Sequence, residues 1–409
     1  MSGSGENLVR LGLDNRSFYV PAFRIFVRET PLSAAVARDV SDVTYEDGTD
    51  RVDSFTLALG NWDASARRAK YIGLPKERLG EANAKLFEPG NEIQLWMGYQ
   101  DELKLMMTGF ITTLDVEYPE QGVARVMVHG LNVIDRLRKQ QFTWTWPDDG
   151  AASVRDSDIA LKLSGDADAE KGRPGLGLKV KIDPAAQARE PSLSHVTLNN
   201  QYPIVFLLER ARRNGYQVTI REESAGAGKK PLQTLYFGPT VNLADTTYVL
   251  EWGRSLQSFR PVYGSAKQLY AVTVCGWDRR TKQKIKERTT LDMLAPDECP
   301  NHDLIGPVKQ AGREDIVTDQ PVNTIEEARK RGQSILREQQ HGMVKASGAT
   351  VGLPDLRAGR VVVIRQAGIP FDGRYFVTST HHTIGEQGYR TTFEALRFGP
   401  EAGAQRPPS

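Results

Sequence analysis

The sequence predicts a mainly β fold with α+β insertions, and three observations along the chain predict it. Near the start, residues 51–60 alternate apolar and polar side chains with a period of two, as a strand with one buried face does. The same period returns beyond residue 240. Between about residues 150 and 235 the apolar spacing changes to that of helices alternating with strands. The predicted order is therefore β, α/β and β again, and the two β regions could be two copies of one barrel.

The first β region is predicted to form a barrel over residues 18–145, behind a flexible N-terminal arm at residues 1–17. Its clearest strands are expected at residues 51–60, 91–99, 110–117 and 124–128. The turn at Pro89 and Gly90 introduces the second of these strands. Strands joined by such short turns favour an antiparallel sheet that curls into a barrel or a sandwich.

A small inserted α/β domain is predicted over residues 146–239. A short helix is expected at residues 156–163, capped by Asp156 or Ser157. The clearer helix begins near Pro203, which suits a first turn, and ends at Gly215. The remaining predicted elements are strands, at residues 179–183, 216–220 and 234–238.

The second barrel is predicted over residues 240–290 and 341–399, with a helical insertion at residues 291–340. Its strands are expected at residues 269–277, 360–365, 374–382 and 389–398. In the insertion, Thr324 and Glu327 form a capping box for a helix with a narrow apolar stripe, which predicts a position outside a sheet. Residues 400–409 are expected to be a disordered tail.

The composition is that of an ordinary soluble globular protein, and it excludes several classes. Of the 409 residues, 39% are hydrophobic, and 53 basic against 51 acidic residues give a formal charge of +2, without the basic surplus of a specific nucleic-acid binder. No apolar run approaches the ~18 residues of a membrane span. The polar N-terminus lacks a signal sequence, so we expect synthesis in the bacterial cytoplasm. Two cysteines exclude a disulfide scaffold.

Several segments in order resemble the phage late control D family of tail hub proteins, which is related to the hub part of the valine-glycine-repeat (VgrG) spike proteins of type VI secretion. The segments are FEPGNEIQLWMGYQ, GFITTLDVEYPEQGVARVMVHGLNVIDRL, HVTLNNQYPIVFLLERARRNGYQVTI, VTVCGWDRRTKQKI and the closing stretch from GLPDLRAGRVVVIR to TTFEALRF. The resemblance covers roughly residues 20–400. No single motif is diagnostic, and the order of the segments carries the likeness.

The resemblance implies two tube-protein-like β-barrels in each chain and a homotrimer whose six barrels surround a pore. Such a baseplate hub would join a hexameric tail tube to a trimeric spike, within a phage tail or another contractile injection particle. Baseplate wedge and LysM-type adaptor proteins would be further partners. Because the sequence ends soon after the last barrel strand, we expect the spike on a separate chain.

The sequence gives no catalytic, cofactor or metal site that we would assign. It lacks the GxSxG, HExxH and GxxxxGK[ST] patterns, so we expect no enzyme activity and no cofactor. Candidate metal ligands occur in three places, which are Asp166, Asp168 and Glu170, then Cys275, Cys299 and His302, then His381 and His382. The first group lacks the glycine and the bidentate glutamate of a calcium loop, and the second lacks paired zinc spacing. The two histidines, as neighbours in a strand, should point to opposite faces.

Two other functions and two kinds of contact remain open. A receptor- or carbohydrate-binding tail module would use exposed aromatic residues such as Trp144 and Trp146, and a cell-wall hydrolase is a remoter alternative. Candidate contacts with neighbouring baseplate parts are the arginines Arg210, Arg212, Arg213, Arg329, Arg331 and Arg337. Unpaired strand edges for assembly are expected among residues 51–60, 92–117 and 373–397.

Overall fold

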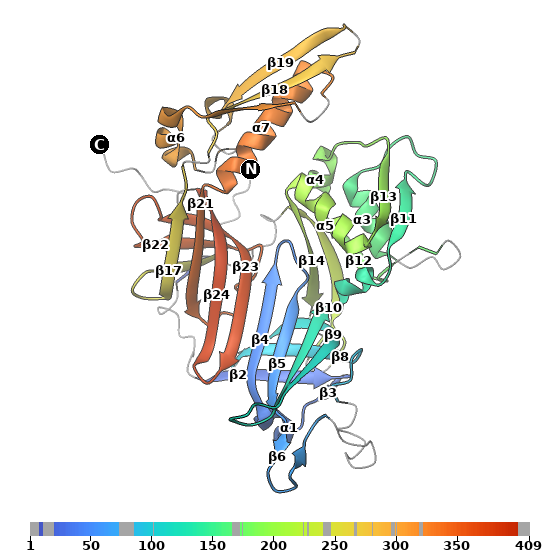
Figure 1. Cartoon of the computed structure of the whole chain (residues 1–409), viewed down its shortest axis with the longest axis vertical. Coiled ribbons are helices and arrows are strands. Elements are labelled where there is room, and N and C mark those ends of the chain that lie inside the picture. The colour runs from blue at the N-terminus through green and yellow to red at the C-terminus, as the bar shows by residue number, and fades with distance from the viewer. Residues whose placement is uncertain are drawn as a thin grey trace.

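The computed structural model describes residues 8–10, 20–72, 86–100, 102–165, 172–173, 175–223, 225–226, 229–239, 247–265, 268–279, 281–295, 299, 301–318 and 322–399. The predicted tail at 400–409 lies outside these residues, as does the predicted N-terminal arm except for residues 8–10. The fold is mainly β, as predicted, and one continuous sheet of 14 strands forms its centre (Figure 1). No helix in the described part of the chain has both the length and the apolar character needed to cross a membrane.

The first half of the central sheet comes from residues 21–132. Its elements are β2 (Pro21–Val27), β3 (Thr30–Pro31), α1 (Ala34–Asp39), β4 (Val40–Gly48), β5 (Ser54–Gly60), β8 (Glu92–Tyr99), β9 (Glu102–Glu117) and β10 (Arg125–Asn132), with a small hairpin of β6 (Trp62–Asp63) and β7 (Arg68–Ala69). Apolar residues alternate along these strands, so one face of the sheet encloses a core that includes Leu57, Ile93 and Val126, all at most 1% exposed.

The second half comes mainly from the C-terminal residues. Its strands are β1 (Leu8–Arg10), β16 (Thr247–Glu251), β17 (Leu256–Tyr263), β21 (Val344–Val351), β22 (Val361–Arg365), β23 (Gly373–Gly385) and β24 (Gly388–Gly399). This half has its own core, which includes Val362, Tyr375 and Phe393.

The two halves have the same strand order. Pairing runs β4-β5-β10-β9-β8-β2 in the first half and β17-β21-β24-β23-β22-β16 in the second. Each strand of one list takes the same place along the chain as its counterpart in the other. The one difference in direction is that β2 pairs antiparallel with β8, whereas β16 pairs parallel with β22. Among the described strands the pairing does not close either half into a complete barrel.

Two β-bulges coincide between the two halves. Thr112 is the extra residue in β9 opposite β10, and Thr378 is the extra residue in β23 opposite β24. Ser41 is the extra residue in β4 opposite β5, and Gln257 is the extra residue in β17 opposite β21. Because a bulge shifts every later side chain to the other face, matching bulges mean that the halves share register as well as order. The five strands from β4 to β8 therefore recur, in order and direction, in the five from β17 to β22, so the chain carries one five-stranded unit twice.

The inserted α/β domain lies between the halves, as predicted. It comprises η2 (Val133–Arg138), β11 (Phe142–Trp146), α3 (Asp156–Ser164), β12 (Lys179–Ile182), α4 (Pro184–Arg189), β13 (Val196–Gln201), α5 (Pro203–Asn214), β14 (Tyr216–Glu223) and β15 (Leu232–Pro239). Pro203 opens α5 and Gly215 ends it in a left-handed conformation, as the sequence predicts. The predicted cap of α3 is wrong by one residue, because Arg155 is the N-cap and its backbone N–H donates to Asp158 Oδ2.

The second insertion is larger than predicted. It contains β18 (Ala271–Asp278), β19 (Gln283–Thr290), η4 (Leu291–Met293), η6 (His302–Leu304), α6 (Gly306–Ala311), β20 (Glu314–Val317) and α7 (Ile325–His341). The sequence assigned residues 269–290 to the second barrel, but β18 and β19 form a separate sheet with β20. Apolar and polar residues alternate along β18 and β19 as they do in any strand with one buried face. This alternation does not show which sheet a strand joins. The face that a barrel strand would turn to the barrel core is instead covered by α7.

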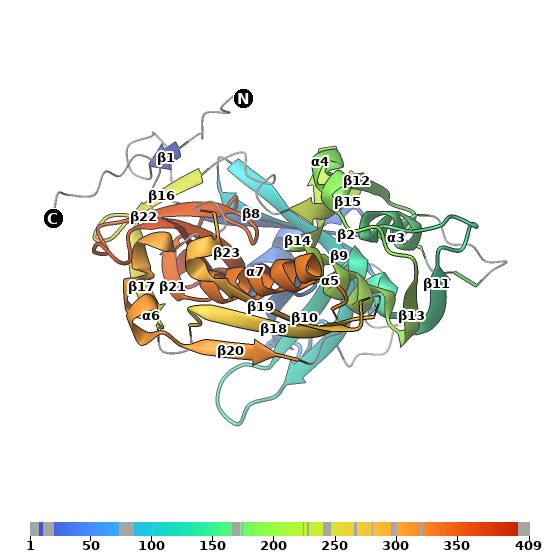
Figure 2. The same cartoon turned by 90° about the horizontal axis from the view of Figure 1, so that it is seen from above.

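Helix α7 packs on β18 and β19 through a face that carries small side chains. Ala328, Gly332 and Leu336 are buried, and a Cβ on Gly332 would lie 2.6 Å from Thr289 Oγ1. The predicted capping box forms in part, because Glu327 N–H donates to Thr324 Oγ1 but the Glu327 carboxylate accepts from Asn323 rather than from Thr324. Figures 1 and 2 show this insertion and the α/β domain at the same end of the central sheet, opposite α1.

Candidate assembly site at the joint between the halves

The two halves meet where β4 pairs with β23. Strand β24 occupies one edge of β23 from Arg374 to Gly385. On the opposite edge, β22 pairs only with residues 373–376, and β4 pairs with the outer residues 379–384. An end strand of the first half therefore extends the sheet of the second by strand addition.

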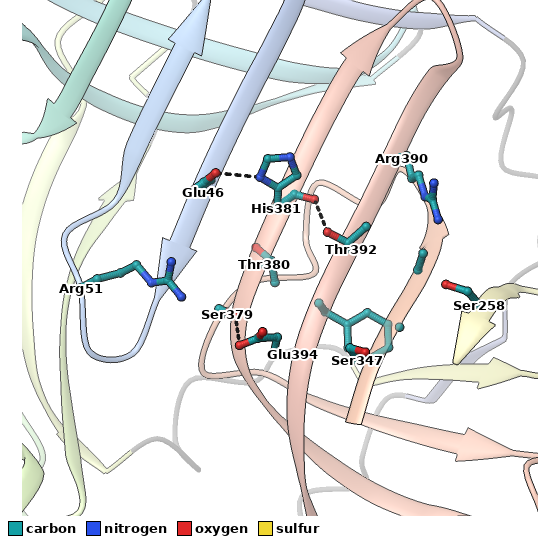
Figure 3. Close-up of a pocket in the computed structure, with 13 residues that line it drawn as sticks. Glu46, Arg51, Ser258, Ser347, Ser379, Thr380, His381, Arg390, Thr392 and Glu394 are labelled. Atoms are coloured by element: carbon teal, nitrogen blue, oxygen red, sulfur yellow. Dashed lines mark hydrogen bonds and ion pairs between the residues drawn. The ribbon is translucent and has the colours of Figure 1, made fainter. Parts of the chain in front are cut away.

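The exposed face of this joint is polar and slightly hollowed. His381 Nδ1 lies 2.9 Å from Glu46 Oε1 across the joint (Figure 3). Its Nε2 lies 3.0 Å from Thr383 Oγ1. An open hollow of about 390 Å³ lies here, and its polar lining includes Glu46, Arg51, Ser258, Ser347, Ser379, His381, Arg390, Thr392 and Glu394. The lining carries charges of both signs among many hydroxyl groups and no apolar anchor pocket, which suits a wetted surface better than a small-molecule site.

The buried face of the joint is held by Asp47. Its carboxylate accepts hydrogen bonds from the backbone N–H of Thr380 at 3.1 Å, from the backbone N–H of Ala358 at 3.2 Å and from the Thr380 hydroxyl. Burial raises the pKa of Asp47, while the neighbouring Arg357 and these hydrogen bonds lower it. Asp47 thus binds two separate backbone segments of the second half to the first.

Arg357, from the second half, binds backbone groups of the first half. Its guanidinium donates to the carbonyl oxygens of Met106 at 3.1 Å and Leu105 at 3.2 Å, and it lies 4.5 Å from the centre of the Tyr45 ring. A buried guanidinium needs such carbonyl, carboxylate and aromatic partners, because an unpaired buried charge is strongly destabilising.

Two further acids lie beside this arginine. Burial raises the pKa of Asp53 to about 8, with the nearby charge of Asp47 acting in the same direction. Burial likewise raises the pKa of Glu222 to about 7. Glu222 belongs to β14, and it accepts hydrogen bonds from the backbone N–H of Thr108 in β9 and from Gln233. The α/β domain is therefore attached to the first half through a carboxylate that titrates near neutrality.

A comparison with family models identifies the chain. A model described as the Alg8 N-terminal domain matches residues 73–386, well over half of the 409-residue chain. The chain belongs to the Alg8 N-terminal domain family. No curated protein matches the sequence. The matching family model is not the late control D family, so that more specific resemblance remains a proposal.

Solved structures with the same fold as this Alg8 N-terminal domain family member are tail proteins. The 43 kDa tail protein of prophage MuSo2 from Shewanella oneidensis is 14% identical, with a TM-score of 0.62 over 92% of this chain and 98% of that one. The tail protein from Neisseria meningitidis MC58 is also 14% identical, with a TM-score of 0.59 over 94% and 99%. The E. coli c3393 protein, a component of the type VI secretion system with structural similarity to the T4 tail proteins gp27 and gp5, is 12% identical, with a TM-score of 0.52 over 93% and 79%. At these identities the likeness establishes the fold.

The candidate metal ligands that the structure describes do not converge in this family member. Among the described residues no group of three or more His, Cys, Asp or Glu side chains could hold a metal ion, and Asp166, Asp168 and Glu170 lie outside them. Cys299 is buried and its Sγ lies 3.7 Å from Gln340 Oε1, with burial raising the pKa of its thiol to about 11. Cys275 is half-buried and His302 is exposed.

The prediction that the paired histidines face opposite ways is confirmed. The His381 side chain is 45% exposed on the polar face of the joint, whereas His382 is fully buried. His382 lies within hydrogen-bond distance of Tyr389, Thr391, Thr380 and the carbonyl oxygen of Leu356, and burial lowers its pKa well below the usual value. A neutral imidazole held on both ring nitrogens is a structural group of the joint.

The aromatic pair and the arginines are also placed. Trp146 is fully buried and stacks on Phe206 with ring centroids 5.8 Å apart, so it is a packing residue of the α/β domain.

Arg210 is buried in an ion pair with Asp156 at 2.5 Å, and it is unsuited to a surface contact. Arg212, Arg213 and Arg329 are exposed, although Arg329 pairs with Glu287, and Arg331 and Arg337 are half-buried.

The predicted edge strands need correction. Strand β5, expected to be an edge, is paired on both sides by β4 and β10, and β23 and β24 are likewise interior. Only the outer part of β9, after Ile111, lacks a partner on its β8 side in the described chain. Among the described residues, strand β17 also has one edge without a partner strand, which the sequence prediction missed. The signal was Pro261, since proline in a strand favours a sheet edge.

Proposed function

We propose that this chain is a structural baseplate hub of a phage tail or another contractile injection system. Three copies would form a ring of six similar β units, which joins a hexameric tail tube to a trimeric spike on a separate chain. The observation that carries the proposal is the five-stranded unit that occurs twice with matching bulges. A chain with two copies of one unit can present six near-equivalent faces to a hexamer with only three polypeptides.

The fold neighbours support this role. Proteins that are named as tail proteins, or as a type VI secretion component similar to phage tail proteins, share the fold over nearly the whole chain. The late control D resemblance of the sequence names the same class of hub. Tail tube, spike, wedge and LysM-type adaptor proteins are the proposed partners.

The proposed assembly is a closed ring. A head-to-tail contact repeated between copies must close on itself, because otherwise it produces an open filament. The hydroxyl-rich face at the joint between β4 and β23 is suited to line a wetted bore, since its lining has charges of both signs and many hydroxyl groups. We assign the chain no catalytic role.

The proposal is tested by purifying the chain alone and together with its proposed tube and spike partners. We expect a complex with three copies of this chain, measured by mass photometry and seen as a ring by negative-stain microscopy. A chain that stays monomeric with both partners present contradicts the proposal. A cleared band on a peptidoglycan zymogram would favour the hydrolase alternative instead.

A further inference from the structure

The chain leaves two complementary strand edges without partner strands among its described residues. One is the outer part of β9, residues 113–117, on the side where β8 has ended. The other is the edge of β17 opposite β21. By the equivalence of the halves, residues 113–117 correspond to 379–383 of β23, and residues 260–264 correspond to 44–48 of β4. These are the segments that pair at the internal joint.

We infer that β17 of one copy adds to the outer part of β9 of the next copy, in the register of the internal joint between β4 and β23. This inference rests on the proposed ring, and it names the contact that closes it. Transferring the internal register places Thr113 opposite Gly264, Leu114 opposite Tyr263, Asp115 opposite Val262, Val116 opposite Pro261 and Glu117 opposite Arg260.

The side chains fit this register on the face that points to the cores. Leu114 and Val116 are partly buried against the first core, and Phe259 and Tyr263 are partly buried against the second. The transferred register places Leu114 beside Tyr263, so that apolar surface left half-covered in the single chain becomes covered. A shift of one residue would place these apolar groups opposite exposed polar ones.

The other face is complementary in charge. Asp115, Glu117, Arg260 and Val262 are all exposed in the single chain. In the transferred register Glu117 lies directly opposite Arg260, and opposite charges at facing strand positions are stabilising. Glu117 and Arg260 occupy the places of Thr383 and Thr44 in the internal joint, so the two joints can be distinguished by their salt dependence.

The backbone of β17 is oriented for such pairing. Gly264 N–H donates to the Met343 carbonyl at 3.0 Å, so Gly264, Val262 and Arg260 direct their backbone groups toward β21. The intervening residues, Tyr263, Pro261 and Phe259, therefore direct theirs outward. Pro261 has no N–H, and the joint between copies accordingly has one bond fewer than the internal joint. That loss also discourages pairing with an unrelated edge.

A cysteine pair tests the register directly. Asp115 and Val262 would form a narrow, non-hydrogen-bonded pair, with Cα atoms about 4.5 Å apart, which a disulfide can span. In a Cys275→Ser background, the Asp115→Cys and Val262→Cys double variant should form intermolecular disulfides on mild oxidation. The matched control, Thr113→Cys with Arg260→Cys, places the sulfurs four residues apart and should give at least about tenfold less product.

A charge exchange gives a second measurement that needs no oxidation. Glu117→Arg and Arg260→Glu each place like charges opposite each other at the joint between copies. For each contact between two copies, either variant should raise the protein concentration at which half of the chains are assembled by about two- to fivefold. The double exchange should restore assembly. A ring that forms without the 115–262 cross-link, or with the 113–260 cross-link instead, overturns this inference and leaves the proposed hub intact. A wild-type chain that never assembles contradicts both.

Discussion

The Asp47 carboxylate accepts the Thr380 backbone N–H at 3.1 Å, across the joint where β4 of the first half meets β23 of the second. The same carboxylate accepts the Ala358 N–H. One buried acid therefore connects two segments more than 300 residues away in sequence from their partner. Such a group is expected to decide whether the two halves stay joined as one sheet.

Replacing Asp47 by Ala should destabilise the chain by about 3 kcal/mol, because it leaves two buried N–H groups and the Arg357 guanidinium without their acid. Glu46→Ala is the matched control on the neighbouring, exposed face. It should cost less than about 1 kcal/mol, since the pair of Glu46 with His381 is open to solvent. Urea unfolding followed by fluorescence measures both, and equal losses for the two variants would contradict the structural role of Asp47.

Stability should fall as the pH rises through neutrality, because burial raises the pKa of Glu222 to about 7. In the unfolded chain a glutamate titrates near 4.3, so the folded state retains the proton over the interval between these values. The stabilisation from Glu222 is fully present below about pH 4.3 and is lost as the pH passes through about 7. Its total is at most about 4 kcal/mol.

Glu222→Gln keeps an acceptor for the Thr108 N–H and removes the titration. The slope of unfolding free energy against pH between about 5 and 7 should therefore decrease in this variant. Asp53 also titrates with a raised pKa, of about 8, so some slope should remain and extend to higher pH. A variant with the full wild-type slope would show that Glu222 does not hold its proton in the folded chain.

Much of this fold could be predicted from alternation and turn residues. The strand pairs β8–β9 and β23–β24 are adjacent in sequence and alternate apolar and polar residues between their bulges, so their sheets follow from local signals. Helix α5 was predicted to within a residue, because Pro203 and Gly215 mark its ends. The His381 and His382 orientations follow from strand geometry alone.

Other features of the fold could not be predicted from the sequence, because they depend on contacts between segments that are far apart along the chain. Strands β18 and β19 read like barrel strands, and only their cover by α7 places them in a separate sheet. The joint depends on contacts between Asp47 and residues far along the chain, which no local pattern contains. Arginines such as the buried Arg210 and the half-buried Arg357 also look like surface residues in sequence, because their partners come from other segments.

Gly130→Ala should destabilise the first half by about 1–3 kcal/mol, because its Cβ would lie 2.2 Å from the Phe55 ring and 2.5 Å from the Phe110 carbonyl oxygen. The control is Gly306→Ala at the start of α6, where a Cβ meets nothing within 4 Å. Thermal unfolding measures both. A Gly130→Ala protein as stable as wild type would mean that Phe55 moves aside, and the close packing of β5 on β10 would need revision.

Trp146→Ala should cost about 3–5 kcal/mol, since it removes a fully buried ring that stacks on Phe206 in the core of the α/β domain. Trp277→Ala removes a tryptophan that is 54% exposed and should be nearly neutral. Differential scanning calorimetry separates the two. Carbohydrate binding by the wild-type chain on a glycan array, lost in Trp146→Ala without loss of stability, would instead support the receptor-binding alternative.

The duplicated unit is tested most directly by electron cryomicroscopy of the assembled chain with its tube and spike partners. Three copies should appear as a ring of six closely similar lobes around one pore, with β17 of each copy beside β9 of the next. A monomer, or a ring in which the two halves of each copy face different directions, would contradict it.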